Sequence, residues 1–265
     1  MSTLTHPGTW VSWWKSRNTT EPGPKGDTEM NYVMVTGAGR PEALGFNLVR
    51  RCLERGDTVL ASVRRPCPPL EALAQTCPGR LHILTMDVSD TASVRAAAEQ
   101  AGKRVPRVDL LVNNAVITSP DCNKEFMQTD LDRLTEVFNV DAVGPLRVIQ
   151  AWMPLLRQSP AALVVNISSE AGSIGTCYRT NMLDYAMAKA ALNMATKTLH
   201  NACRELPDLN ILCLHPGWMR TNPGNAAAPL LPYDHARTLL DLFRKVQTDK
   251  SAPVFMDYKG EAYPW

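Results

Sequence analysis

Residues 32–45 read YVMVTGAGRPEALG, a short apolar run of strand-forming residues that leads directly into a glycine-containing loop. Three glycines, Gly37, Gly39 and Gly45, allow the backbone of such a loop to turn sharply and to approach a bound pyrophosphate closely. The apolar spacing of Leu44–Arg55, directly after the loop, predicts a helix, and a helix N-terminus attracts anions. A strand, a glycine loop and a helix in this order predict a dinucleotide-binding site.

The same alternation of strand and helix continues to the end of the chain. The predicted strands are Tyr32–Val35, Thr58–Val63, Leu81–Met86, Leu110–Asn113, Leu163–Ile167, Ile211–Leu214 and a short one near Val254–Met256. The predicted helices are Leu44–Arg55 closed by Gly56, an Ala-rich one capped by Asp90 or Ser89, Asp130–Leu156 and Leu183–Arg204. Because each parallel crossover needs a helix, this pattern predicts an α/β fold: a single doubly wound Rossmann-type domain over residues 31–265, with a parallel sheet flanked by helices.

Composition and charge argue against several classes of protein. The 28 basic and 26 acidic residues leave a net charge of +2. This charge is too small to create the strongly positive surface by which many proteins attract nucleic acids. No apolar stretch reaches the roughly 18 residues of a membrane span, and no signal-peptide core is present. The seven cysteines are scattered and form no Cys-x-x-Cys pair, so we expect no disulfide framework, no metal site and a reduced, cytoplasmic protein.

Residues 1–30 differ from the rest of the chain, because they contain several prolines and no sustained periodicity. We expect a poorly ordered extension, or a functional start at Met30. The alternative is an arm that docks its three tryptophans, Trp10, Trp13 and Trp14, on another surface.

The charges at the end of the second predicted strand favour NADP over NAD. A site selective for NAD places a carboxylate here, where it binds the ribose hydroxyls and repels a 2′-phosphate. This chain has Val63 followed by Arg64, and Arg40 in the glycine loop can reach the same phosphate. Guanidinium groups suit bidentate phosphate binding, whereas the alternative is that both arginines are merely solvated.

The glycine loop resembles the Thr-Gly-x-x-x-Gly-x-Gly motif of short-chain dehydrogenase/reductases. Gly37 and Gly45 match the first and last glycines, Ala43 replaces the middle one, and Pro41 and Glu42 lengthen the loop. Three further segments resemble motifs of this family in the right order: Asp87-Val88, Asn113-Asn114-Ala115-Val116 and Pro216-Gly217-Trp218-Met219-Arg220-Thr221. In the second of these, Val116 stands where the family usually has glycine.

This resemblance, together with the charge argument for Arg40 and Arg64, implies a set of cofactor contacts. The implied residues are Gly37, Gly39, Arg40, Gly45, Arg64, Asp87, Val88, Asn114, Tyr185, Lys189, Pro216, Gly217 and Thr221. The sequence His215-Pro216-Gly217-Trp218, together with the ending from Val254 to Trp265, is similar to the C-factor-like branch of the family.

Reduction of a carbonyl group needs a proton donor for the nascent alkoxide, and a tyrosine next to a lysine can supply one. Tyr185 and Lys189 are four residues apart, so a helix places them on one face, where the ammonium stabilises a phenolate. Tyr178 is the competing tyrosine, but Met182 stands where its lysine would be.

The resemblance also implies two further catalytic positions. Alignment to the family's Ser-x-x-Gly places the functional hydroxyl on Ser169, with Ser168 as the alternative. Alignment to Asn-x-x-Gly places Asp141 where the family has a catalytic asparagine, while Asn139 points elsewhere on a helix. A carboxylate can accept a hydrogen bond from water or lysine there, but it cannot donate one.

The sequence therefore predicts an NADP-dependent oxidoreductase that transfers hydride between NADPH and a ketone or aldehyde. A short lid of small and apolar residues, expected at Asn222–Pro232, points to a small, fairly apolar substrate. We expect a homodimer or homotetramer with no nucleic-acid or membrane partner. The rival hypothesis is a non-catalytic, cofactor-binding signalling or regulatory protein, which the departures at Ala43, Val116 and Asp141 favour.

Overall fold

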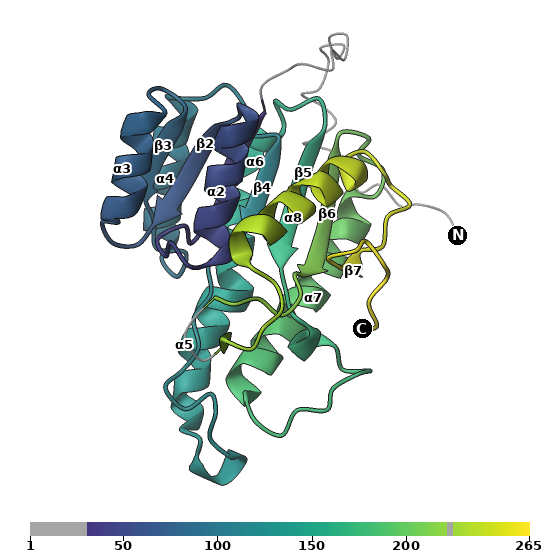
Figure 1. Ribbon diagram of the computed structural model, residues 1–265. Coiled ribbons are helices and arrows are strands. Elements are labelled where there is room, and N and C mark those ends of the chain that lie inside the picture. Colours follow the sequence, from purple (N-terminus) through teal and green to yellow (C-terminus); the bar gives the residue numbers. More distant parts are fainter. Residues whose placement is uncertain (1–30, 222–224) are drawn as a thin grey trace.

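The centre of the fold is a single parallel sheet with the spatial order β3-β2-β1-β4-β5-β6-β7. The computed structural model describes residues 31–221 and 225–265, so the expected extension at 1–30 and part of the expected lid, 222–224, lie outside the described residues. The strands are β1 (Tyr32–Val35), β2 (Thr58–Val63), β3 (Leu81–Thr85), β4 (Leu110–Asn113), β5 (Ala162–Ile167), β6 (Leu209–His215) and β7 (Phe255–Asp257). This sheet confirms the expected α/β, Rossmann-type fold (Figure 1).

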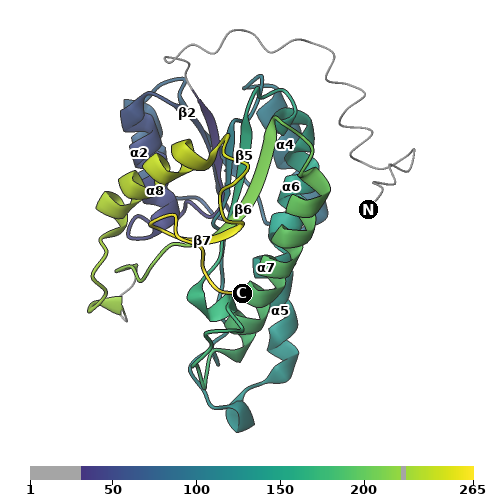
Figure 2. The same ribbon diagram turned by 90° about the vertical axis from the view of Figure 1, so that its right-hand side faces the viewer.

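Helices cover both faces of the sheet (Figure 2). They are α2 (Leu44–Arg55), α3 (Pro68–Thr76), α4 (Thr91–Gly102), α5 (Leu134–Phe138), α6 (Gly144–Leu156), α7 (Leu183–Cys203) and α8 (Pro232–Val246). In Figure 2, α2 and α8 lie on one side of the sheet and α4, α6 and α7 on the other. Within the described part of the chain, none of these helices is long and apolar enough to span a membrane.

The alternation of side chains along each strand produces two hydrophobic cores. In β1, Val33 and Val35 belong to the core that contains α2 and α8, whereas Met34 belongs to the core that contains α4 and α6. Successive residues of a strand point to opposite faces, so a sheet covered on both sides is mostly apolar, and its buried polar residues, such as Asn113 and Asn166, form hydrogen bonds. The strands therefore pack into a core on each face of the sheet, and their carboxyl ends lie along one edge.

The local signals in the sequence located several elements correctly. Helix α2 spans the predicted residues, and Gly56 ends it in the left-handed conformation at φ 99°. Of the two candidate caps for α4, Asp90 is the N-cap residue, and its side chain accepts a hydrogen bond from the Ala92 N–H at 2.9 Å.

The segment predicted as a helix over Asp130–Leu156 is helical from Leu131 to Leu156, but it is not a regular α-helix throughout. The segment consists of a 3-10 turn (Leu131–Arg133), α5, a turn of π-helix (Asn139–Val143) and α6. A π-helical turn accommodates extra backbone within a helix and is frequent at functional sites. Here Gly144 follows the turn, and a Cβ at this position would lie 3.0 Å from the Val88 side chain, so glycine permits close packing against the segment after β3.

The order of the strands reverses between β1 and its neighbour β4, since the chain first proceeds outward through β2 and β3. In open parallel sheets, ligands bind in the crevice outside the carboxyl ends of the strands at such a reversal point. The glycine loop follows β1 at this edge, and the segments that carry most other candidate residues follow β3, β4, β5 and β6.

Candidate active site

The glycine loop is tied to the end of β4. The hydroxyl oxygen of Thr36 accepts hydrogen bonds from the N–H groups of Asn114 at 2.9 Å and Ala115 at 3.0 Å. Gly37 adopts φ 71°, and a Cβ on it would lie 2.7 Å from the Cα of Ala115. Glycine is therefore required at this position both by the backbone conformation and by the close approach of β4.

Asn114 has a structural role that the sequence did not reveal. Its side-chain nitrogen donates to the carbonyl oxygens of Thr36 at 2.9 Å and Gly37 at 3.2 Å. A Cβ on Gly45 would lie 2.4 Å from this nitrogen, which explains the glycine at the start of α2. Asn114 thus joins the loop, α2 and β4, whereas the resemblance had implied only a contact with the cofactor.

The lengthened part of the loop is held by the first turns of α2. The side chain of Asn47 donates to the carbonyl oxygens of Pro41 at 2.9 Å and Ala43 at 2.8 Å. Ala43, the N-cap residue, offers no side-chain hydrogen bond to the first turn. The N-terminal N–H groups of α2 therefore have no cap from this residue, as in a helix that binds an anion at its N-terminus.

Arg40 and Arg64 are exposed at the edge of the sheet, while Val63 is buried. Asp87, at the end of β3, accepts hydrogen bonds from the Ser89 N–H at 2.9 Å and the Ser89 hydroxyl at 2.6 Å. Partial burial raises the pKa of Asp87, but these hydrogen bonds and the nearby charge of Arg64 outweigh burial, so the pKa lies below its usual value. A cation and a carboxylate thus lie close together at this edge of the sheet.

Tyr185 and Lys189 lie on one face of α7, as their spacing predicts. The Lys189 ammonium is 5.4 Å from the centroid of the Tyr185 ring, and it donates to the carbonyl oxygen of Ile167, at the end of β5, at 3.1 Å. Its side chain is only 3% exposed, whereas Tyr185 is half-buried. Tyr178 is 77% exposed, and the cation near its ring is Arg179, not a lysine.

Asp141 lies in the π-helical turn and is fully buried. One of its oxygens is 3.4 Å from the Lys189 ammonium, and the other accepts the Ile117 N–H at 2.9 Å. Burial raises the pKa of Asp141, and the charge of Lys189 opposes this rise. The side chain of Asn139 is directed elsewhere, because its oxygen accepts from Arg147 at 2.6 Å.

The two serines at the end of β5 have different surroundings. The hydroxyl of Ser168 donates to the side-chain oxygen of Asn193 at 2.6 Å and thereby joins β5 to α7. Ser169 follows at the carboxyl end of the strand, and its oxygen accepts the Ala171 N–H at 3.2 Å. Gly172 lets this turn approach α7, because a Cβ there would lie 2.8 Å from the main chain of Lys189. Ser168 is thus bonded to a side chain of α7, whereas Ser169 stands at the start of the turn that follows β5.

The segment after β6 is fixed by α8. Nε2 of His235 lies 2.7 Å from the carbonyl oxygen of Pro216. Gly217 adopts φ 82°, and a Cβ on it would collide with the side chains of Leu230 and Tyr258. Thr221 ends this described stretch, and the expected lid continues beyond it. Of the lid, the described part includes Ala228, which is fully buried, and Leu231, which is exposed.

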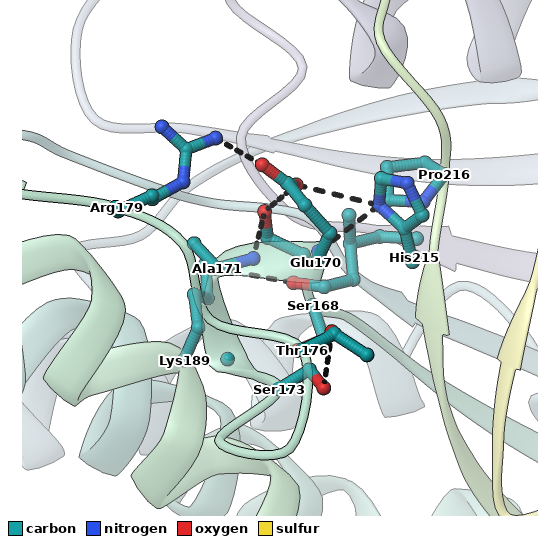
Figure 3. Close-up of polar contacts among 12 residues, drawn as sticks. Ser168, Glu170, Ala171, Ser173, Thr176, Arg179, Lys189, His215 and Pro216 are labelled. Carbon is teal, nitrogen blue, oxygen red and sulfur yellow. Dashed lines mark hydrogen bonds and ion pairs between the residues drawn. The ribbon is translucent and has the colours of Figure 1, made fainter. Parts of the chain in front are cut away.

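Sequence reasoning missed a cluster formed by Glu170, Arg179 and His215 (Figure 3). Glu170 forms an ion pair with Arg179 and accepts a hydrogen bond from the hydroxyl of Ser169 at 2.5 Å. His215, at the end of β6, has its Nδ1 3.7 Å from Oε2 of Glu170, the same oxygen that accepts the hydrogen bond from Ser169. The position of Glu170 directly after Ser169 was the only signal available, since the contact with Arg179 depends on the path of a loop.

Comparisons of sequence place the chain among oxidoreductases. The family described as short chain dehydrogenase matches residues 31–228. C-signal of Myxococcus xanthus is 34% identical over 158 residues, which are 60% of this chain and 93% of that protein. An uncharacterized oxidoreductase of Schizosaccharomyces pombe is 33% identical over 228 residues, which are 81% of this chain and 85% of its own.

Comparisons of structure agree. The NADPH-bound carbonyl reductase from chicken fatty liver superposes with a TM-score of 0.79 and 30% identity, covering 90% of this chain and 100% of that one. A short-chain dehydrogenase/reductase of Burkholderia multivorans with bound NADP has a TM-score of 0.79 and 27% identity, covering 89% and 100%. The chain therefore belongs to the short-chain dehydrogenase/reductase family of oxidoreductases.

Proposed function

We propose that this protein is an NADP-dependent reductase that transfers hydride between NADPH and a small, fairly apolar ketone or aldehyde. The observation that carries this proposal is the position of Lys189 beside the Tyr185 ring, at the same sheet edge as Ser169 and the glycine loop. A proton donor, a cation that stabilises its conjugate base and a hydroxyl are the groups that carbonyl reduction requires.

The residues at the reversal point fit a dinucleotide. The glycine loop lies against β4, α2 begins without a side-chain cap from Ala43, and Arg40 and Arg64 are exposed nearby. We assign the pyrophosphate to the N-terminus of α2 and the 2′-phosphate to the two arginines. When bound, the nicotinamide supplies or accepts the hydride. The NADPH-bound and NADP-bound structural neighbours support this choice of cofactor.

Two side chains act on the substrate oxygen in this proposal, and a third acts on one of these two. Tyr185 donates its phenolic proton to the oxygen that becomes the alcohol, and Lys189 stabilises the phenolate that remains. Ser169 contributes a hydroxyl group that forms a hydrogen bond with the same oxygen. Asp141 and the carbonyl oxygen of Ile167 hold the Lys189 ammonium in place.

The choice of cofactor can be tested at the exposed end of β2. Arg64→Ala is expected to weaken NADPH binding about 10-fold, because a charge-assisted hydrogen bond to the 2′-phosphate is lost, and to change NADH binding less than about 2-fold. Isothermal titration of each cofactor measures both constants. Arg237→Ala, an equal loss of charge at an exposed position on α8, should change neither. Equal losses for NADPH and NADH would refute the assignment of Arg64.

The activity itself is tested with a panel of ketones and aldehydes by following the consumption of NADPH.

The second candidate function is that of a non-catalytic, cofactor-binding signalling protein. It is favoured by the similarity to C-signal and by Val116, which is 36% exposed where the family usually has glycine. Binding of NADPH without its consumption by any compound of the panel would favour this second candidate.

We also propose that the protein is a cytoplasmic homodimer or homotetramer. The seven cysteines are all free thiols, as in a reducing compartment. Apolar side chains are exposed on α5 and α7, among them Phe138, Met187 and Met194, and such a surface suits an interface between identical subunits. Light scattering after size-exclusion chromatography measures the molar mass in solution and tests the proposed oligomeric state.

A further inference from the structure

The hydroxyl group of Ser169 is already engaged by a neighbouring carboxylate. Its oxygen lies 2.5 Å from Oε2 of Glu170, and a carboxylate can only accept, so the serine is the donor. The same oxygen accepts the Ala171 N–H at 3.2 Å. A serine hydroxyl has one proton and two lone pairs, so one lone pair remains free.

Glu170 is held both by its carboxylate and by its main chain (Figure 3). Its Oε1 binds the guanidinium of Arg179, which belongs to the loop before α7. The N–H of Glu170 donates to Nδ1 of His215 at 3.2 Å, which requires that this ring nitrogen carry no proton. Burial lowers the pKa of His215, in agreement with a neutral ring.

Glu170 is ionised in these surroundings. Burial raises its pKa, but the hydrogen bond from Ser169 and the pairing with Arg179 outweigh burial, and the pKa lies below its usual value. An ionised carboxylate is a much stronger hydrogen-bond acceptor than the oxygen of a ketone or aldehyde. A carbonyl substrate must therefore compete with Glu170 for the proton of Ser169.

We propose that Glu170 determines whether the catalytic serine prefers the alcohol or the carbonyl form of the substrate. This inference rests on the proposed function, since it assigns Ser169 to the substrate oxygen. An alcohol can donate its own proton to the free lone pair of Ser169 while the bond to Glu170 stays intact. A ketone has no proton to donate, so it can use Ser169 only after that bond is broken. Glu170 is thus a positioning residue that acts through Ser169 and favours the alcohol.

The experiment uses acetophenone and 1-phenylethanol as a matched pair of probes. Isothermal titration of acetophenone into the NADP⁺ complex, and of 1-phenylethanol into the NADPH complex, measures binding alone, because neither mixture can transfer hydride. Glu170→Gln retains the size of the side chain and removes its charge. The ratio of the ketone Kd to the alcohol Kd should fall about 10-fold, as expected for the loss of a hydrogen bond to a charged group.

The control variants separate this role from a structural one. Ser169→Ala removes the hydroxyl, so adding Glu170→Gln to it should change the ratio less than about 2-fold if Glu170 acts through the serine. If Glu170 only anchors the loop through Arg179, its substitution would weaken the binding of both probes by the same factor. That factor would be equal in the wild-type protein and in the Ser169→Ala variant. Glu99→Gln, at an exposed position on α4, should leave both dissociation constants unchanged.

The outcomes distinguish this inference from the proposed function. An unchanged ratio in Glu170→Gln would overturn the role of Glu170, even if the wild-type protein reduces acetophenone. A ratio that falls as expected, in a protein that consumes no NADPH with acetophenone or with any other compound of the panel, would support the role of Glu170 and contradict the proposed reductase. Absence of binding of both probes to the wild-type complexes would contradict both proposals.

Discussion

Tyr185→Phe is expected to lower kcat for carbonyl reduction by about 10²- to 10⁴-fold, the range typical for the loss of an acid–base group. The substitution removes one oxygen and leaves the aromatic ring, which lies 5.4 Å from the Lys189 ammonium. Folding and NADPH binding should therefore remain nearly unchanged. Steady-state kinetics measures the loss of turnover, and isothermal titration measures the affinity for NADPH.

Tyr178→Phe is the matched control for this prediction. It makes the same chemical change seven positions earlier, on a side chain that is 77% exposed, and should leave kcat unchanged. A loss below 10-fold in Tyr185→Phe, or an equal loss in Tyr178→Phe, would show that Tyr185 is not the proton donor.

Lys189→Met is expected to reduce turnover at least 100-fold and to destabilise the fold by about 3 kcal/mol at pH 7. The lysine is the cation next to Asp141, whose carboxylate is fully buried and has its second oxygen 3.4 Å from Lys189. Removal of one partner leaves an uncompensated charge in the interior, which costs more than the intact pair. Urea unfolding measures the loss of stability.

The pH dependence of this variant follows from the direction of the pKa shift. Burial raises the pKa of Asp141 above its usual value, and Lys189 opposes that rise, so loss of Lys189 raises the pKa further. A carboxyl group with a raised pKa in the folded state destabilises the fold as pH rises through that pKa. Lys189→Met should therefore be least stable, relative to wild type, at neutral pH, and this deficit should shrink as the pH is lowered toward 5.

Asp141→Asn supplies the controls for this prediction. Added to Lys189→Met, it removes the unpaired charge and should recover at least half of the lost stability but none of the activity. As a single substitution, it restores the residue usual in the family and should keep or raise turnover if the carboxylate is only a tolerated departure. A Lys189→Met protein as stable as wild type at pH 7 would contradict the buried ion pair.

The sequence was sufficient to predict those elements that are determined by residues close together in the chain. Apolar runs located β1, β2 and β4, and Gly56 marked the end of α2 because its φ of 99° suits glycine. The spacing of Tyr185 and Lys189 on one helix face likewise follows from helix geometry alone. These features depend on residues that are close in sequence.

Features that depend on tertiary contacts could not be predicted. The π-helical turn that carries Asp141 lies within a segment of helix-forming residues, and it is supported by packing of Gly144 against Val88. The role of Asn114 as a link between the glycine loop and β4 depends on the pairing of distant strands. The ion pair between Glu170 and Arg179 joins two residues through a loop whose path leaves no periodic signal.

Transfer of deuterium from NADPH labelled at C4 of the nicotinamide tests the central claim most directly. The wild-type protein is incubated with acetophenone and with NADPH deuterated on either face of the ring, and the product is analysed by mass spectrometry. We expect 1-phenylethanol that carries deuterium on its carbinol carbon with one of the two labelled cofactors and not with the other. Binding of NADPH without labelled alcohol, from acetophenone or from any other carbonyl compound of the panel, would contradict the assignment of this protein as a carbonyl reductase.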